Sequence, residues 1–359
     1  MIHAHTALTS ATTHQGEILF LVGIIANPAA SKDIRRLVAQ GRVIPDWEKV
    51  NTVRRVMLGL QSVGVTNVLA MADSSNLVRR ACDAPNLSID LEFVDMPSFY
   101  SEGDTVRAAA AMAEQGVDCL ITLGGDGTNR AAVVGSRALP MVAISTGTNN
   151  VFPTMVEGTL AGLAAGMVAN GRLDLAQVSQ SSKIMNIYVD GELKDIALID
   201  VALSKERFVS TRAIWEIDTL YEVFLTRAEP ASIGLSSIGA RLEAVSLADE
   251  GGLQYSIADS EESEEEGEDS SNRTVLAPIA PGVVPPVLIS SWHRMADGER
   301  LIIEKRDCTV ALDGERSFSV NQSQQLEVEV RREGPPVIDV SLALEIAAKQ
   351  GLFDLAPGN

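Results

Sequence analysis

A glycine-rich segment, Gly124-Gly125-Asp126-Gly127-Thr128-Asn129, offers the clearest chemistry in this chain of 359 residues. Its three glycines allow the backbone to approach a phosphate without a Cβ collision, and the unpaired N–H groups at a helix start attract such an anion. Asp126 would repel phosphate, so a carboxylate here makes sense if it holds Mg²⁺ or accepts a proton from a hydroxyl group. The alternative is a Gly-Asp-Gly turn without a ligand. The segment predicts a nucleotide site for phosphoryl transfer, with Thr128 and Asn129 adding side-chain hydrogen bonds.

Short polar side chains also follow two other apolar runs. Asn27 comes directly after the run 18–26, and three residues follow the run 140–145, namely Thr148, Asn149 and Asn150. We expect Asn27 to hydrogen-bond a nucleotide or to brace the loops, and we expect the later cluster to bind adenine or ribose. The alternatives are structural, because Asn27 can close an Asx turn and the later cluster can cap a helix near residue 153.

Acidic residues between two late strands form a further candidate site. Asp313 and Glu315 flank a glycine, and we expect a catalytic or metal-binding role for them, although Asp313-Gly314 is equally typical of a hairpin turn. The tripeptide Asp190-Gly191-Glu192 is similar, and we interpret it as a plain hairpin. Asp200 lies among apolar residues and therefore needs a partner or a ligand.

Residues 18–150 alternate apolar runs with helical patterns, which predicts an α/β fold. The runs 18–26 and 117–123 are continuously apolar, as expected of strands buried on both faces. Strands alternating with helices indicate a Rossmann-like, mainly parallel sheet. Ligands bind such sheets beyond the carboxyl ends of the strands, where the glycine segment comes, followed by a helix predicted from about residue 129.

The pattern changes after residue 150. We expect a helix over 156–170, a hairpin at Asp190-Gly191, a helix over 211–227 and then short strands, among them 239–247. Residues 151–335 are thus predicted to form a β-rich, antiparallel acceptor domain. The composition predicts a disordered acidic insertion at 249–273. We expect 1–17 to be a flexible N-terminus and 336–359 to be a strand and helix that pack back.

Composition limits the function classes. The formal net charge is −19, and eight acidic residues lie between 259 and 269. Nucleic acid and anionic membranes attract positively charged proteins, so we expect neither nucleic-acid binding nor stable membrane association.

The three cysteines, Cys82, Cys119 and Cys308, fit neither a disulfide framework nor a zinc site. No run approaches the roughly 20 apolar residues of a membrane span, and residues 1–16 lack the pattern of a signal peptide. We expect a cytoplasmic protein, and self-association into a homo-oligomer stays open.

The sequence Gly124-Gly125-Asp126-Gly127-Thr128 resembles the GGDGT motif of NAD kinases, diacylglycerol kinases and sphingosine kinases. Asn27-Pro28 is similar to the early Asn-Pro turn of that superfamily. The segment Gly147-Thr148-Asn149-Asn150-Val151-Phe152-Pro153 is similar to its third loop, Gly-Thr-x-Asn-Asp-Phe-Ala, and Asp313-Gly314-Glu315 resembles the Asp-Gly-Glu of the lipid-kinase branch. Over residues 18 to about 330 the chain resembles the ATP–NAD kinase-like group that includes the acetoin-catabolism protein X family.

The resemblance implies a kinase that uses ATP and Mg²⁺. It implies catalytic roles for Asp126, Asp313 and Glu315, with Asp126 also holding the metal. The acceptor that it implies is NAD(H), or a hydroxyl group of a related nucleotide or small molecule. The alternatives are a lipid kinase of the diacylglycerol or sphingosine type and a catalytically weak nucleotide-binding regulator of acetoin catabolism.

Two departures from the superfamily pattern bear on that choice. Asn129-Arg130 follows Thr128 directly, where the superfamily often has an uncharged residue and then Asn-Glu, so the acidic residue is absent. Asn150 stands where the lipid kinases have Asp. The first departure favours the regulator, since an acidic side chain of the site is missing.

Overall fold

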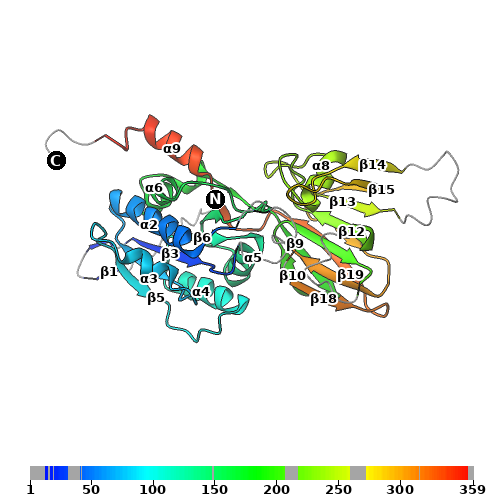
Figure 1. Cartoon of the computed structure of the whole chain (residues 1–359), viewed down its shortest axis with the longest axis horizontal. Coiled ribbons are helices and arrows are strands. Elements are labelled where there is room, and N and C mark those ends of the chain that lie inside the picture. Colours follow the sequence, from blue (N-terminus) through cyan, green and yellow to red (C-terminus); the bar gives the residue numbers. More distant parts are fainter. Residues whose placement is uncertain are drawn as a thin grey trace, which may run out of the picture.

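The structure is a computed structural model that describes residues 13–14, 17–18, 20–30, 41, 43–147, 149–206, 217–258, 272–314 and 316–354. Figure 1 shows two halves side by side, an α/β half that contains the start of the chain and an antiparallel β half. The chain crosses into the β half after about residue 183 and returns at residue 336 to finish on the α/β half. The predicted fold class, a Rossmann-like, mainly parallel α/β part followed by a β-rich antiparallel part, is confirmed.

The sheet of the α/β half has seven strands in the order β5-β4-β3-β6-β7-β20-β8, and only β8 runs antiparallel to its neighbour. The strands are β5 Asp90–Phe93, β4 Asn67–Ala70, β3 Leu21–Ala26, β6 Cys119–Gly124, β7 Met141–Ser145, β20 Pro336–Ile338 and β8 Ser179–Ser181. Two strands of two residues each, β1 (Thr13–His14) and β2 (Glu17–Ile18), pair separately. The strand order reverses between β3 and β6, so the crevice at their carboxyl ends is where an open parallel sheet binds ligands.

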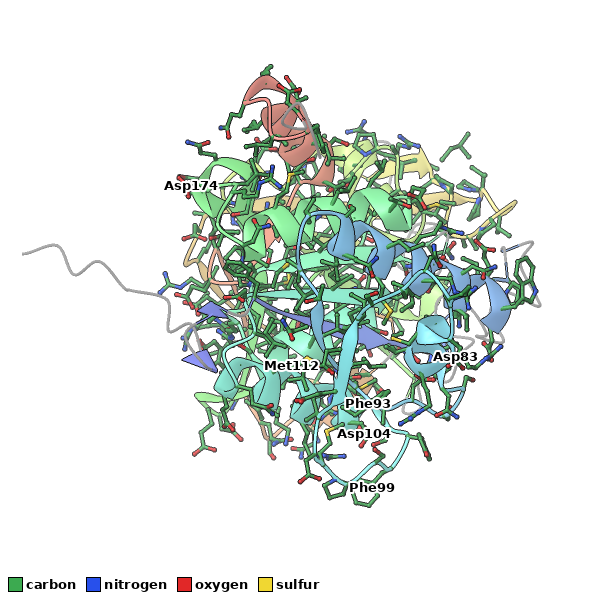
Figure 2. The ribbon with its side chains drawn as sticks, turned by 90° about the vertical axis from the view of Figure 1, so that its left-hand side faces the viewer. Asp83, Phe93, Phe99, Asp104, Met112 and Asp174 are labelled. Carbon is green, nitrogen blue, oxygen red and sulfur yellow. The ribbon has the colours of Figure 1, made fainter. Side chains whose placement is uncertain are left out.

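Helices cover both faces of this sheet (Figure 1). One face carries α2 Asp46–Ser62, α3 Leu77–Cys82, α6 Gly158–Ala169, α7 Leu175–Val178 and α9 Val340–Lys349. The other face carries α4 Glu102–Glu114 and α5 Asp126–Gly135. The start of α4 is fixed by Asp104, whose carboxylate accepts the N–H groups of Phe99 and Ser101. Figure 2 shows Phe99 at the outer rim of the half and Asp104 just inside it.

Small residues let α2 and α6 approach closely. A Cβ atom added to Gly162 of α6 would lie 2.1 Å from the carbonyl oxygen of Val56 in α2, and one added to Gly59 would lie 2.4 Å from that of Thr159. Such separations are impossible for any other residue, so these glycines set the distance between the helices. The pair packs over the central strands that end at the predicted site.

The β half contains two antiparallel sheets. The larger has the order β14-β15-β13-β12-β11-β17-β18 and the smaller the order β10-β9-β19-β16. The strands are β9 Ile184–Val189, β10 Glu192–Ala197, β11 Asp200–Ser204, β12 Leu220–Leu225, β13 Gly252–Ile257, β14 Arg273–Leu276, β15 Pro286–Met295, β16 Arg300–Ile302, β17 Cys308–Leu312, β18 Arg316–Val320 and β19 Leu326–Arg331. One apolar core lies between the sheets, and a second lies under the helix α8 (Leu235–Leu242).

Three predicted elements of the β half are wrong. The helix predicted over 211–227 is a short 3-10 turn at Ile217–Thr219 followed by β12, while 211–216 lie outside the described residues. Tyr, Val and Phe in β12 favour a strand, and pairing with β11 and β13 fixes it there. The strand predicted over 239–247 overlaps α8, where apolar residues recur at the helical spacing. The insertion predicted over 249–273 is wrong for its first part, because 252–257 form β13, which pairs with β12 and β15 inside the larger sheet. Its most acidic part, 259–271, lies outside the described residues.

No described helix is long and apolar enough to cross a membrane.

Candidate functional site

The glycine segment joins β6 to α5 at the crevice. Strand β6 ends at Gly124, and α5 begins at Asp126 rather than near residue 129 as predicted. Asp126, Gly127 and Thr128 are therefore the first turn of the helix. The N–H groups of a first turn have no partner within the helix, and the helix dipole makes this end partly positive. The segment thus places a carboxylate and a set of amide donors at the carboxyl edge of the sheet.

Two of the glycines leave room for neighbouring side chains. A Cβ atom on Gly124 would lie 2.6 Å from the side chain of Thr128, and one on Gly125 would lie 3.1 Å from Oδ1 of Asn150. The missing side chains therefore allow Thr128 and Asn150 to pack against the segment. This is a packing reason for glycine, in addition to the close approach of a phosphate that the sequence suggested.

Asn27 links the ends of the two central strands. Its Nδ2 donates a hydrogen bond of 2.9 Å to Oγ1 of Thr128, and its Oδ1 accepts one of 2.9 Å from the N–H of Ala29. It thus braces the glycine segment and also closes an Asx-type turn, so the expected bracing and its structural alternative are present together.

Lys49 supports the same turn and was missed from the sequence. It projects from α2, is 1% exposed, and its Nζ donates to the carbonyl oxygens of Pro28 (2.7 Å) and Ala30 (2.5 Å). The available signal was a lysine on the apolar face of a predicted helix. A buried ammonium must be satisfied by acceptors, so Lys49 fixes the backbone that follows Asn27.

The other predicted amide side chains are directed differently. Asn129 is fully buried, its Oδ1 accepts from Oγ1 of Thr122 at 2.6 Å, and its Nδ2 donates to the carbonyl of Gly125 at 2.8 Å. This differs from the nucleotide contact predicted for Asn129, because its place in α5 turns the amide toward β6. Asn150 donates from Nδ2 to Oγ of Ser145 at 2.8 Å. Asn149 is exposed, and Thr148 lies outside the described residues.

Asp126 is 9% exposed and is held by the loop after β7. Its Oδ1 accepts the N–H groups of Val151 (3.1 Å) and Phe152 (2.8 Å), and its Oδ2 accepts that of Val151 (3.1 Å). Burial, followed by the charge of Asp313, raises the pKa of Asp126 to about 7, although the amides and the charge of Arg227 oppose the rise. This carboxyl group can therefore exchange a proton near neutral pH.

Asp313 comes from the β half and faces the same place. It lies in the turn between β17 and β18 with φ 48°, next to Gly314 with φ 67°, so the hairpin interpretation is also correct. Its carboxylate accepts the N–H groups of Leu198 (2.9 Å) and Ile199 (2.8 Å). Burial raises the pKa of Asp313, while these amides lower it. Glu315 lies outside the described residues.

Arg227 adds a positive charge to this carboxylate pair, and it too was missed. It follows β12, its side chain is 7% exposed, and Nη1 donates to the carbonyl of Val151 at 3.3 Å. Its guanidinium carbon lies 5.4 Å from the ring centre of Phe152. Burial lowers the pKa of Arg227, while the charges of Glu229 and Asp126 raise it. The sequence offered no signal for this role, because Arg227 was the last residue of the helix predicted over 211–227.

Arg130 clamps the two halves beside the site. Its side chain is 2% exposed, and Nη1 lies 3.0 Å from Oδ1 of Asp195 on β10, while Nη2 pairs with Glu102 of α4. Arg316 of β18 approaches the same Asp195 carboxylate at 2.5 Å. The helix that follows the glycine segment thus carries a buried arginine that is neutralised by acids from both halves.

The donor set suits a magnesium–nucleotide ligand better than a metal held by protein alone. Among the described residues no cluster of three or more His, Cys, Asp or Glu side chains could enclose an ion. Mg²⁺ usually binds through one or two carboxylates with substrate phosphates and water. Two buried carboxyl groups, Asp126 and Asp313, fit that requirement, and the charge of Asp313 contributes to the raised pKa of Asp126.

Comparisons with known proteins agree with this layout. Residues 22–172 match the ATP-NAD kinase N-terminal domain, and residues 183–333 match the Acetoin catabolism protein X C-terminal domain. The chain is 38% identical over 353 residues to acetoin catabolism protein X of Cupriavidus necator, covering 95% of this chain and 96% of that protein. Two crystal structures described as diacylglycerol kinases from Bacillus anthracis str. Sterne each cover 89% of this chain, and 97% and 96% of their own, at a TM-score of 0.44 and 14% and 13% identity. The resemblance inferred from the glycine segment is confirmed, and the chain belongs to the acetoin catabolism protein X family.

Proposed function

We propose that the chain is an ATP-dependent kinase of the NAD kinase-like superfamily that phosphorylates a hydroxyl group of NAD(H), or of a related nucleotide or small molecule. One observation carries the proposal. The carboxyl group of Asp126 stands at the first turn of α5, has a pKa of about 7 and faces Asp313 across the two halves. A phosphate-binding helix start and a proton acceptor therefore share one place.

Asp126 would accept the proton of the acceptor hydroxyl group. A general base works best when its pKa lies near the working pH, and burial raises the pKa of Asp126 to about 7. Its Oδ2 accepts one N–H group, from Val151, while Oδ1 accepts two. Because each carboxylate oxygen has about two lone-pair sites, Oδ2 is the atom that we assign to the hydroxyl proton.

The amide groups of the first turn of α5 would bind the phosphates of ATP. Asn27 and Lys49 would keep this turn and the turn after β3 in position, through the contacts with Thr128 and with the carbonyl oxygens of residues 28 and 30. Asp313 would hold the Mg²⁺ that accompanies ATP, and Asp126 would attract this ion by its charge while its Oδ2 accepts the hydroxyl proton. The ion neutralises phosphate charge when bound. The apolar cluster that joins Phe152 to Leu198 and Ile199 would exclude water from this side of the site.

A phosphorylation assay tests the proposal. Purified protein and Mg²⁺·ATP are incubated separately with NAD⁺, NADH, diacylglycerol and sphingosine, and the products are separated and identified. Formation of NADP(H) is the expected result. Lipid phosphate as the only product would replace the proposal by a lipid kinase.

A second candidate, a catalytically weak nucleotide-binding regulator of acetoin catabolism, is favoured by one observation. The acidic residue of the superfamily pattern is absent after Thr128, and Arg130 in this segment pairs with Glu102 and Asp195. Measurable ATP binding without any phosphorylated product in the same assay would favour this candidate.

A further inference from the structure

We propose that Arg227 binds the phosphoryl group that is transferred, the γ-phosphate of ATP. This inference rests on the proposed kinase function and adds a cationic residue that the glycine segment does not supply. The first turn of α5 provides amide dipoles, and the two nearby aspartates are negative. Mg²⁺ would neutralise only part of the phosphate charge, and Arg227 of the β half, which donates to the carbonyl of Val151 beside Asp126, is placed to add a positive charge from the protein.

Arg227 and Asp126 hold the same peptide unit from two sides. The guanidinium Nη1 donates to the carbonyl oxygen of Val151, while the N–H of Val151 donates to both oxygens of Asp126. The two side chains also interact electrostatically, since each shifts the pKa of the other. A hydroxyl group at Asp126 would therefore have its attacking oxygen within the field of the arginine.

The backbone at Arg227 is fixed by the segment that holds Asp313. The N–H and Oγ1 of Thr226 donate to the carbonyl oxygens of Ile199 (2.9 Å) and Leu198 (2.6 Å). The N–H groups of the same two residues donate to the Asp313 carboxylate. Arg227 and Asp313 are thus positioned together, and no ordering of the backbone is needed when a ligand binds.

The guanidinium group has unused hydrogen-bonding capacity. It carries five N–H donors, yet Nε is buried and has no hydrogen-bond partner within the described part of the chain. Glu229 forms an ion pair with Arg227, but its oxygen lies 3.7 Å from Nη1, which is too far for a good hydrogen bond. Buried polar groups normally have partners, and the planar donor fork of arginine matches the oxygens of a phosphate.

The test compares the affinities for ATP and ADP, measured by isothermal titration calorimetry with Mg²⁺ and without acceptor. ADP lacks the γ-phosphate, so the affinity ratio isolates the contribution of that group. We expect wild-type protein to bind ATP more tightly than ADP. Because a hydrogen bond to a charged group contributes about 1.5–3 kcal/mol, Arg227→Gln should weaken ATP binding by about 10- to 100-fold and leave ADP binding nearly unchanged.

Arg227→Lys provides a second variant if Arg227→Gln does not fold. It keeps the charge and loses the planar fork, so it should lower the ATP-to-ADP affinity ratio by less than Arg227→Gln, by about 3- to 10-fold. Arg300→Gln, on β16 in the smaller sheet of the β half, is the control and should keep the wild-type ratio. An ATP-to-ADP affinity ratio equal to that of wild type in either Arg227 variant would overturn this proposal without contradicting the kinase function. Wild-type protein that binds neither nucleotide would instead overturn the kinase function, and this inference with it.

Discussion

The raised pKa of Asp126 predicts how the stability of the fold depends on pH. Burial raises this pKa from 3.8 to about 7, so between these values the folded protein holds a proton that the unfolded chain has lost. The group therefore contributes its full stability below the unfolded pKa, and that contribution is lost as the pH rises through the folded pKa. Linkage gives a loss of about 2–3 kcal/mol in the free energy of unfolding between about pH 5 and about pH 8 from this side chain.

Asp126→Asn removes the titrating carboxyl group. Comparing this variant with wild type therefore gives the contribution of Asp126 to the pH dependence of the free energy of unfolding. The free energy of unfolding would be measured by urea denaturation, followed by far-ultraviolet circular dichroism, at several pH values for wild-type and variant proteins. The variant loses an acceptor for the amides of Val151 and Phe152, which adds an offset that does not depend on pH. The difference in unfolding free energy, variant minus wild type, should rise by about 2–3 kcal/mol from about pH 5 to about pH 8. Parallel pH profiles for the two proteins would refute the assigned pKa of Asp126.

Two further substitutions test the packing that positions the site. Gly162→Ala should lower the free energy of unfolding by about 1–3 kcal/mol, because the added Cβ would lie 2.1 Å from the carbonyl oxygen of Val56. Its control, Leu160→Ala on the exposed side of the same helix, should change the free energy of unfolding by less than about 1 kcal/mol. Arg130→Gln should cost about 3–5 kcal/mol, because it removes a guanidinium group that is 2% exposed from Asp195, whose side chain is 10% exposed. Arg316→Gln should cost about 1 kcal/mol or less, because the side chain of Arg316 is 50% exposed. Chemical denaturation measures both pairs, and equal effects within a pair would contradict its explanation.

The sequence predicted those parts of the site whose structure depends only on neighbouring residues. A continuous apolar run followed by glycines and a helix predicts a strand, a turn and a helix start, and the structure has these at β6 and α5. The Asp-Gly turns at 190–191 and 313–314 were predicted for the same reason. Both residues of each turn have a positive φ, and Asp-Gly is a dipeptide that adopts this conformation readily. The motif residues were therefore found without any knowledge of long-range contacts.

Residues whose role arises from distant contacts were missed. Arg227 reaches the carbonyl of Val151 across 76 residues of sequence, and Lys49 reaches that of Pro28 across 21. No spacing or motif joins such pairs. The prediction that Asn129 contacts a nucleotide differed from the structure for a related reason, because only the pairing with Thr122 shows which way its amide is directed.

The strand β12 shows how tertiary pairing overrides local pattern. Its apolar residues, at 220, 223, 224 and 225, fit a helical spacing as well as a buried strand. Hydrogen bonding to β11 on one side and to β13 on the other makes this segment a strand. The same pairing brings Arg227, two residues after β12, to the site, so the misassigned element also hid the missed residue.

The most direct measurement of the central claim is phosphoryl transfer by Asp126→Asn with a matched control. Asp118→Asn is that control, because Asp118 also accepts a backbone N–H, from Leu21, and burial also raises its pKa, but it lies before β6 at the opposite edge of the sheet. Transfer from ATP labelled at the γ-phosphate to NAD(H) would be measured for wild type and both variants, each checked for folding by circular dichroism. We expect Asp126→Asn to lower turnover by about 100-fold or more, as for loss of a general base, and Asp118→Asn to keep wild-type turnover. Unchanged turnover in folded Asp126→Asn would contradict the assignment of the reaction to this site.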